Sequence, residues 1–303
     1  MKDEAFLKKP VDIRTASTLI MIRKCSDEIQ VNLVKRSEKS GFMSGKYVFP
    51  GGAIDELDRD TELWEPRIDM KSDEIASRFG GGLRSEEIIA YGVSAIRETF
   101  EEAGVLLAER GSKETGIVDD HQARSPRDIF SNDGFQKKVI SEGWILQFSR
   151  LFRWSHWITP ELMRKRYDTR FFLSVVPAGT VCRPDHREVT ESLWVTPKKA
   201  LAKNLDGEIS LSPPTLVTLH ELLEYHEMEM LEKEAGNREW GEPILPRLIP
   251  LEKGSIIIEP WDSEYRDREI RVNQQQLKSS VVPVGTPFSR IWYDTMVWRP
   301  VGR

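Results

Sequence analysis

Three glutamates and one arginine stand within six residues of a segment whose other residues indicate a buried helix. The run is Arg97-Glu98-Thr99-Phe100-Glu101-Glu102-Ala103-Gly104-Val105. Glu98, Glu101 and Glu102 are spaced by three and four positions, so a helix places them on one face. One arginine cannot neutralise three neighbouring carboxylates, whereas a divalent cation can. The run therefore predicts a helix that holds a hard metal ion, with a solvated acidic helix face as the alternative.

A second run lies upstream and reads as a short strand that ends in a glycine turn. Its residues are Tyr47-Val48-Phe49-Pro50-Gly51-Gly52. Glycine has no Cβ, so the carbonyls of Gly51 and Gly52 can approach a metal or a phosphate closely. A strand, a Gly-Gly turn and a helix with three glutamates together predict a site for a metal and a diphosphate.

The two runs resemble the box of the Nudix hydrolase family, Gly-x5-Glu-x7-Arg-Glu-U-x-Glu-Glu-x-Gly-U, where U is a bulky apolar residue. Gly52 and the half from Arg97 to Val105 match, with Thr99 at one U position. Asp58 stands where the first Glu is expected, and Ile89 stands where the spacing back from Arg97 demands it. Residues from about 57 to 91 therefore look like an insertion within the box.

The resemblance implies metal-assisted hydrolysis of a diphosphate, with Mg²⁺ or Mn²⁺ as the cofactor. Metal ions clamp the phosphate oxygens and activate a water, and a carboxylate takes its proton. The implied catalytic residues are Arg97, Glu98 and Glu101, with Glu98 as a metal ligand or as the general base. Family members often recruit a further carboxylate from outside the box. The expected metal ligands are Glu98, Glu101, Glu102, Gly52, Glu188 and Glu191.

A second resemblance concerns the substrate. Nudix enzymes that cleave coenzyme A carry Leu-Leu-Thr-x-Arg-Ser-x3-Arg-x3-Gly-x3-Phe-Pro-Gly-Gly before the box. Arg36, Ser37 and Gly45 are in register with this signature, whereas Gly41 stands at its second arginine. The long insertion also resembles a subgroup that acts on coenzyme A and acyl-coenzyme A. The implied substrate-binding residues are Arg36, Phe49 and Gly51.

These resemblances imply cleavage of coenzyme A or acyl-coenzyme A into 3′,5′-ADP and (acyl-)4′-phosphopantetheine. Another nucleoside diphosphate derivative, such as ADP-ribose or NADH, is the alternative substrate. A ligand-binding Nudix protein without activity is the alternative from a different class, although such a protein has no need of three repelling carboxylates.

The predicted fold class is α/β (α+β), a Nudix fold in which a mixed β-sheet is sandwiched between helices. Strands are expected within 14–52 and 167–196, and helices at 85–109 and 213–234. The Nudix domain would span 12–235, with helical insertions at about 57–84 and 121–142. A β-rich C-terminal extension of unknown role would span 236–303, with strands at 255–258 and 291–298.

Composition points to a cytoplasmic protein that acts on a small nucleotide-type molecule. The net charge of −5 does not favour nucleic-acid binding. Neither an apolar run of the ~20 residues that span a bilayer nor a signal-peptide core is present, so we expect no membrane partner. A homodimer is compatible with the sequence.

Overall fold

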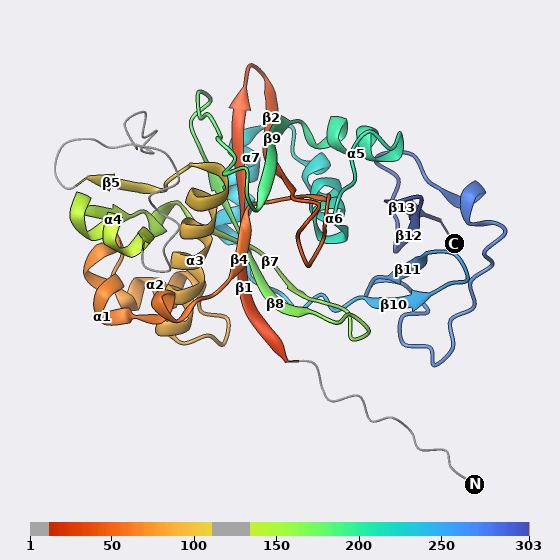
Figure 1. Cartoon of the computed structure of the whole chain (residues 1–303), viewed down its shortest axis with the longest axis horizontal. Helices are drawn as coiled ribbons and strands as arrows, with labels where there is room; N and C mark the ends of the chain where they lie inside the picture. Colours follow the sequence, from red (N-terminus) through yellow and green to blue (C-terminus); the bar gives the residue numbers. More distant parts are fainter. Residues whose placement is uncertain (1–11, 111–133, 303) are drawn as a thin grey trace, which may run out of the picture.

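A mixed seven-stranded sheet lies at the centre of the computed structural model, which describes residues 12–110 and 134–302 (Figure 1). Its strands are β1 (Ile13–Cys25), β2 (Glu28–Arg36), β3 (Tyr47–Val48), β4 (Gly51–Ala53), β7 (Phe152–Ile158), β8 (Arg166–Val175) and β9 (Val189–Val195). The order is β3-β2-β1-β8-β7, with β4 paired to β1 and β9 paired to β2. Only β1 and β8 run parallel among these pairs, so the sheet is mixed as predicted.

Helices cover both faces of this sheet because the central strand β1 is apolar on both sides. Leu19 and Met21 point into a core that includes α3 (Ser85–Ala103). Ile20 and Ile22 point into a second core that includes α5 (Pro197–Leu205) and α6 (Pro213–Glu221). Alternate side chains of a strand face opposite ways, so two layers are needed to bury them. The predicted sandwich is confirmed, with α3 and α6 on opposite sides of β1 (Figure 1).

The helix that carries the glutamates ends six residues before its predicted end. Gly104 adopts the left-handed conformation, with φ at 70°, and its N–H donates to Phe100 O over 2.9 Å. A glycine is favoured at this helix-ending position because it has no Cβ to clash. Residues 104–109 therefore leave the helix, and Ala108–Arg110 forms β5 instead. The prediction of one helix to 109 is wrong for this reason.

The predicted helix at 213–234 is also wrong, because it is two helices with a break. After α6 come η5 (Leu222–Glu224) and then α7 (Met228–Asn237). Tyr225 takes an extended conformation at the break, and its ring packs 6.2 Å from the ring of Trp154. The break allows both Leu222 and Leu231 to be buried in the same core.

The insertions are helical where the structure describes them. Residues 57–84 form η1 (Glu56–Arg59), α1 (Thr61–Trp64), η2 (Glu65–Arg67) and α2 (Ser72–Phe79), as predicted. Of the predicted insertion at 121–142, residues 121–133 lie outside the described ranges, and α4 (Gly134–Glu142) forms its end. Next come β6 (Trp144–Leu146), which pairs with β5, and η4 (Phe148–Arg150). None of the helices in the described ranges is long and apolar enough to cross a membrane.

The C-terminal region forms a four-stranded antiparallel sheet, shown in blue in Figure 1. Its elements are β10 (Arg247–Pro250), β11 (Ser255–Ile258), η6 (Leu277–Ser280), β12 (Arg290–Asp294) and β13 (Val297–Val301). The β-rich character and the strand at 255–258 are confirmed. The single strand predicted at 291–298 is a hairpin, whose turn residues Thr295 and Met296 have φ of 45° and 70°. Positive φ at both turn positions is the geometry of a two-residue hairpin loop.

A buried carboxyl group without a partner follows β11. Glu259 is 0% exposed, and neither of its carboxylate oxygens has a hydrogen bond in the structure as described. Burial raises the pKa of Glu259 to about 8. The folded protein therefore keeps this carboxyl protonated at neutral pH, whereas the unfolded chain releases the proton near pH 4.3.

Glu259→Gln is expected to stabilise the protein at high pH only. Between about pH 4.3 and 8 the folded state binds one more proton than the unfolded state, so wild-type stability falls as pH rises. A neutral glutamine removes this loss. Calorimetry at pH 9 should show a melting temperature at least about 5 °C above wild type, and at pH 5 about the same as wild type. An equal difference at both pH values would contradict the burial of an unpaired carboxyl.

Candidate active site

The Gly-Gly turn lies directly over the glutamate helix. β4 pairs with β1 in the register Thr18↔Gly51 and Ser17↔Gly52, while β3 pairs with the end of β2. A Cβ on Gly52 would lie 2.4 Å from the carboxyl carbon of Glu98, and a Cβ on Gly51 would lie 2.4 Å from Ser17 O. The backbone at Ser17 leaves no room for a side chain on Gly51, and a side chain on Gly52 would displace the Glu98 carboxylate.

Arg97 holds the strand turn and the helix together. Its Nε and Nη2 donate to the two oxygens of Asp58 over 2.9 and 2.7 Å, and Nη2 also donates to Ala53 O over 3.1 Å. Its Nη1 donates to Glu98 and Glu101 over 2.8 and 2.9 Å. Arg97 and Asp58 are 8% and 1% exposed, so this is a buried bidentate ion pair.

Glu102 is the most buried of the three glutamates, at 2% exposure. Its Oε2 accepts from the Gly51 N–H over 3.0 Å, whereas Oε1 has no hydrogen bond in the described structure. Arg36 Nη1 lies 3.5 Å from Oε1. Burial and the charge of Glu98 together raise the pKa of Glu102 well above its usual range, against the opposing effect of Arg36. A buried carboxylate oxygen that accepts no hydrogen bond is a suitable ligand for a cation.

Burial also raises the pKa values of the other two glutamates. The pKa of Glu101 rises to about 7, and that of Glu98 rises as well, although Arg97 opposes both shifts. In the described ranges no three acidic, His or Cys side chains form a group that could hold a metal ion as they stand. Glu98 and Glu101 each bond Arg97. The donor set nevertheless fits a hard divalent cation, which would take the place of the protons.

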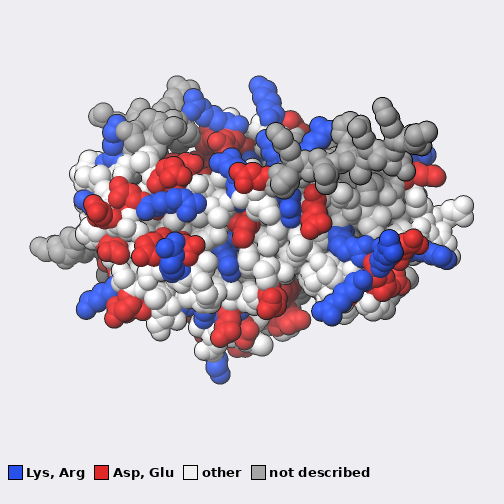
Figure 2. Space-filling model, turned by 90° about the horizontal axis from the view of Figure 1, so that it is seen from below, with Lys and Arg blue, Asp and Glu red and all other residues white. Residues whose placement is uncertain are grey.

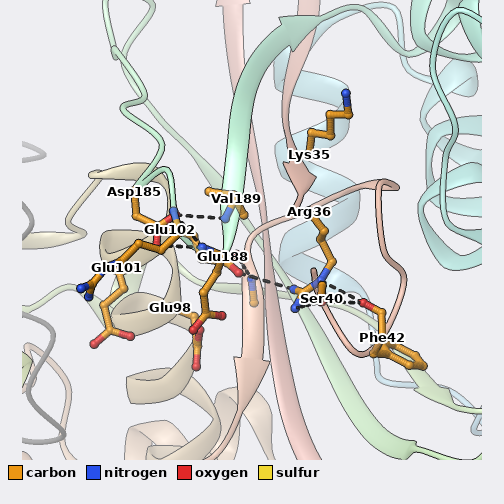
Figure 3. A network of polar contacts seen from close by, with 12 residues as sticks. Lys35, Arg36, Ser40, Phe42, Glu98, Glu101, Glu102, Asp185, Glu188 and Val189 are labelled. Carbon is orange, nitrogen blue, oxygen red and sulfur yellow. Dashed lines mark hydrogen bonds and ion pairs between the residues drawn. The ribbon is translucent and has the colours of Figure 1, made fainter. Parts of the chain in front are cut away.

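The two candidate carboxylates outside the box differ in position. Glu188 points toward Glu98 in Figure 3, lines the same cavity, and raises the pKa values of both Glu98 and Glu102 by its charge. Asp185 accepts from the Glu188 and Val189 N–H groups and so shapes this loop. Glu191 instead accepts from Lys35 Nζ over 3.1 Å and from the Tyr47 hydroxyl over 2.7 Å. The structure therefore brings Glu188 to the cluster and does not bring Glu191.

A cavity of about 650 Å³ opens beside these carboxylates. Its volume is within the range of roughly 300–1,000 Å³ that is typical of small-molecule sites. Glu98, Glu101, Arg36 and both glycines line it. Phe49 also borders the cavity, but it is only 3% exposed and belongs mainly to the core on the α6 side.

Comparison with known sequences decides the family. A family model described as the NUDT19 Nudix domain matches residues 13–222. The chain belongs to this Nudix family. It is a Nudix hydrolase, and the run on α3 is the second half of its Nudix box.

Curated relatives of this Nudix hydrolase cover most of its length. An acyl-coenzyme A diphosphatase NUDT19 of Xenopus laevis is 29% identical over 79% of this chain and 72% of its own. The human protein of the same name is 27% identical over 86% of this chain and 79% of its own. A crystal structure of a Nudix hydrolase from Alicyclobacillus acidocaldarius superposes with a TM-score of 0.59 at 27% identity, covering 77% of this chain and 99% of that one.

The Nudix box is completed by a residue whose role the sequence left open. Asp58 stands six positions after Gly52, and the structure shows that it pairs with Arg97 across the insertion. The shorter carboxylate reaches because Asp58 lies on η1, which packs against α3. Thr99, at a position expected to be bulky and apolar, is buried with its hydroxyl bonded to Ala95 O over 2.7 Å.

Two basic residues that the sequence did not single out also lie near the site. Arg14 on β1 lines the cavity and is exposed. At Gly41, where the coenzyme A signature has its second arginine, a Cβ would lie 2.5 Å from Lys165 Nζ. The ammonium group of this lysine, from the loop between β7 and β8, therefore lies where the side chain of that arginine would start. No local pattern links Gly41 to Lys165, since they are far apart in the chain.

Proposed function

We propose that this protein hydrolyses the diphosphate linkage of coenzyme A or acyl-coenzyme A, with release of 3′,5′-ADP and (acyl-)4′-phosphopantetheine. One observation carries the proposal: a guanidinium, Arg36, lies 3.5 Å from a buried box glutamate, Glu102, beside the cavity. The names of the Xenopus and human relatives support the same substrate class.

The proposed cofactor is Mg²⁺ or Mn²⁺, held by Glu98, Glu101 and Glu102 with help from a glycine carbonyl of β4. When bound, such an ion neutralises the diphosphate and lowers the pKa of a bound water. Arg36 pairs with a phosphate oxygen, for which a planar guanidinium is well suited. Ser40 Oγ and Phe42 O accept from the Arg36 guanidinium over 3.1–3.2 Å and aim it (Figure 3).

The protein's own carboxylates supply the proton acceptor. Glu98 and Glu188 face each other over the cavity, and either can take a proton from a water that attacks the diphosphate. Arg97 is a positioning residue, because its bonds orient Glu98 and Glu101. Residues 12–235 form the catalytic domain in this proposal, in keeping with the family match at 13–222.

The surface charge agrees with a small-molecule substrate. On the face in Figure 2, acidic and basic side chains are interspersed over the part of the chain that is coloured. Such a mixed surface differs from the broad basic patch that is typical of nucleic-acid binding. We also propose that the protein is cytoplasmic and forms a homodimer.

Incubation with coenzyme A and Mg²⁺ or Mn²⁺ at mildly alkaline pH tests the function. Chromatography should show 3′,5′-ADP and 4′-phosphopantetheine in equal amounts, and no product when the metal is chelated. ADP-ribose and NADH should be cleaved with a lower kcat/KM. If either compound is cleaved faster than coenzyme A, that compound replaces coenzyme A as the proposed substrate. Binding of coenzyme A without any cleavage would identify a non-catalytic protein.

A further inference from the structure

One face of the C-terminal sheet forms part of the cavity wall. The strand register places Leu248, Ile257 and Ile291 in one row, and Ser255, Tyr293 and Trp298 in the next row on the same face. All of these except Ile291 line the cavity that also contains Glu98 and Arg36. The opposite face, with Ile256, Ile258 and Trp292, packs in a separate core under residues 265–281.

The C-terminal sheet is fixed to the Nudix domain at Lys46, just before β3, and at Asn204 on α5. Lys46, which is 6% exposed, donates to Met296 O and, over 2.8 Å, to Ser210 Oγ. Its ammonium lies 4.9 Å from the ring centre of Tyr293. Asn204 Nδ2 donates to Trp298 O over 2.7 Å. The sheet is therefore a built wall of the cavity rather than a loosely attached appendage.

The cavity extends from the carboxylates to this wall and is lined by residues of β1 and β8 as well. Figure 1 shows α3 on one side of β1 and β10–β13 on the far side. The wall is mainly apolar, and the apolar residues Met43, Met163 and Pro214 line the same cavity. A substrate with its diphosphate at the glutamates can therefore lay one of its two halves along an apolar surface.

We propose that the C-terminal sheet binds the acyl-pantetheine half of the substrate and sets the preference for the acyl chain. This inference rests on the proposed function. Coenzyme A thioesters are asymmetric about the diphosphate: one half is a charged nucleotide and the other is a flexible arm that ends in an alkyl chain. An alkyl chain gains from an apolar wall by about fourfold in affinity for each methylene taken out of water.

Ser255→Phe tests the proposal by filling the part of the cavity beside the wall. Ser255 lines the cavity from the start of β11, so a phenyl ring there takes the space of the acyl chain. Calorimetry with hexanoyl-4′-phosphopantetheine should show binding at least tenfold weaker than in wild type, with binding of 3′,5′-ADP unchanged. Leu248→Ala, which removes wall surface instead of adding bulk, should weaken the same ligand roughly fivefold.

Ser279→Phe is the matched control, because Ser279 is exposed on η6 and does not line the cavity. It should leave both affinities at the wild-type value. The inference is overturned if wild type does not bind hexanoyl-4′-phosphopantetheine, if both wall variants bind it normally, or if they weaken 3′,5′-ADP by the same factor. Turnover of coenzyme A by wild type, measured separately, tests the proposed function alone, so the two failures are distinguishable.

Discussion

Glu102→Gln is expected to lower kcat for coenzyme A by about three orders of magnitude. The change removes one charge from the most buried ligand of the proposed metal site, while the amide oxygen can still accept from the Gly51 N–H. Steady-state kinetics with saturating Mn²⁺ measures the loss. The melting temperature without metal should not fall, because burial and the charge of Glu98 disfavour the ionised carboxylate that the amide replaces.

Glu191→Gln is the control for this variant. Glu191 was a candidate ligand from the sequence, but it bonds Lys35 and Tyr47. We therefore expect its kcat to stay within about twofold of wild type, the effect of a surface substitution. Mn²⁺ should raise the melting temperature of wild type and Glu191→Gln, and should not do so for Glu102→Gln. Near-normal activity of Glu102→Gln would overturn the assignment of the metal site.

Asp58→Ala is expected to destabilise the fold by about 3–5 kcal/mol. The change leaves the Arg97 guanidinium buried without its bidentate partner, and it removes the acceptor of the Asp55 N–H. Urea unfolding followed by circular dichroism measures the lost free energy of unfolding. Activity should also fall, because Arg97 orients two of the box glutamates.

Asp55→Ala is the control for Asp58→Ala. It removes a charge near Arg97 but leaves the buried pair between Arg97 and Asp58 in place. The Asp55 carboxylate lies 3.9 Å from Arg97 Nη2, but its side chain is 59% exposed. Solvent screens such a pair, so the expected loss is within about 1 kcal/mol. If Asp58→Ala lost no more than this control, the buried pair would not be the contact that joins the strand turn to the helix.

The glutamates of α3 were predictable from sequence because their spacing is local. Helix geometry alone puts Glu98, Glu101 and Glu102 on one face, and the glycines of β4 are needed wherever a strand approaches a carboxylate closely. The sandwich of helices around the sheet follows from β1 in the same way, since a strand that is apolar on both sides needs a layer on each.

Contacts between distant segments were not predictable. The spacing rule of the box cannot show whether Asp58 meets Arg97, because the insertion between them folds away as α1 and α2. Tyr225 at the helix break packs against Trp154, and Lys165 reaches Gly41 from a loop more than a hundred residues away. Each of these depends on packing between elements, which local propensity does not encode.

The sequence by itself indicated the kind of chemistry: three carboxylates on one helical face beside a glycine turn favour a cation. Tertiary structure alone decided which other groups join them. It brought Glu188 in and left Glu191 out, and it turned residues after 236 into a wall of the cavity through the contacts of Lys46 and Asn204. The reason is the distance along the chain over which each effect acts. Helix geometry relates residues up to four positions apart, whereas a cavity is closed by distant segments that meet only after the core has packed.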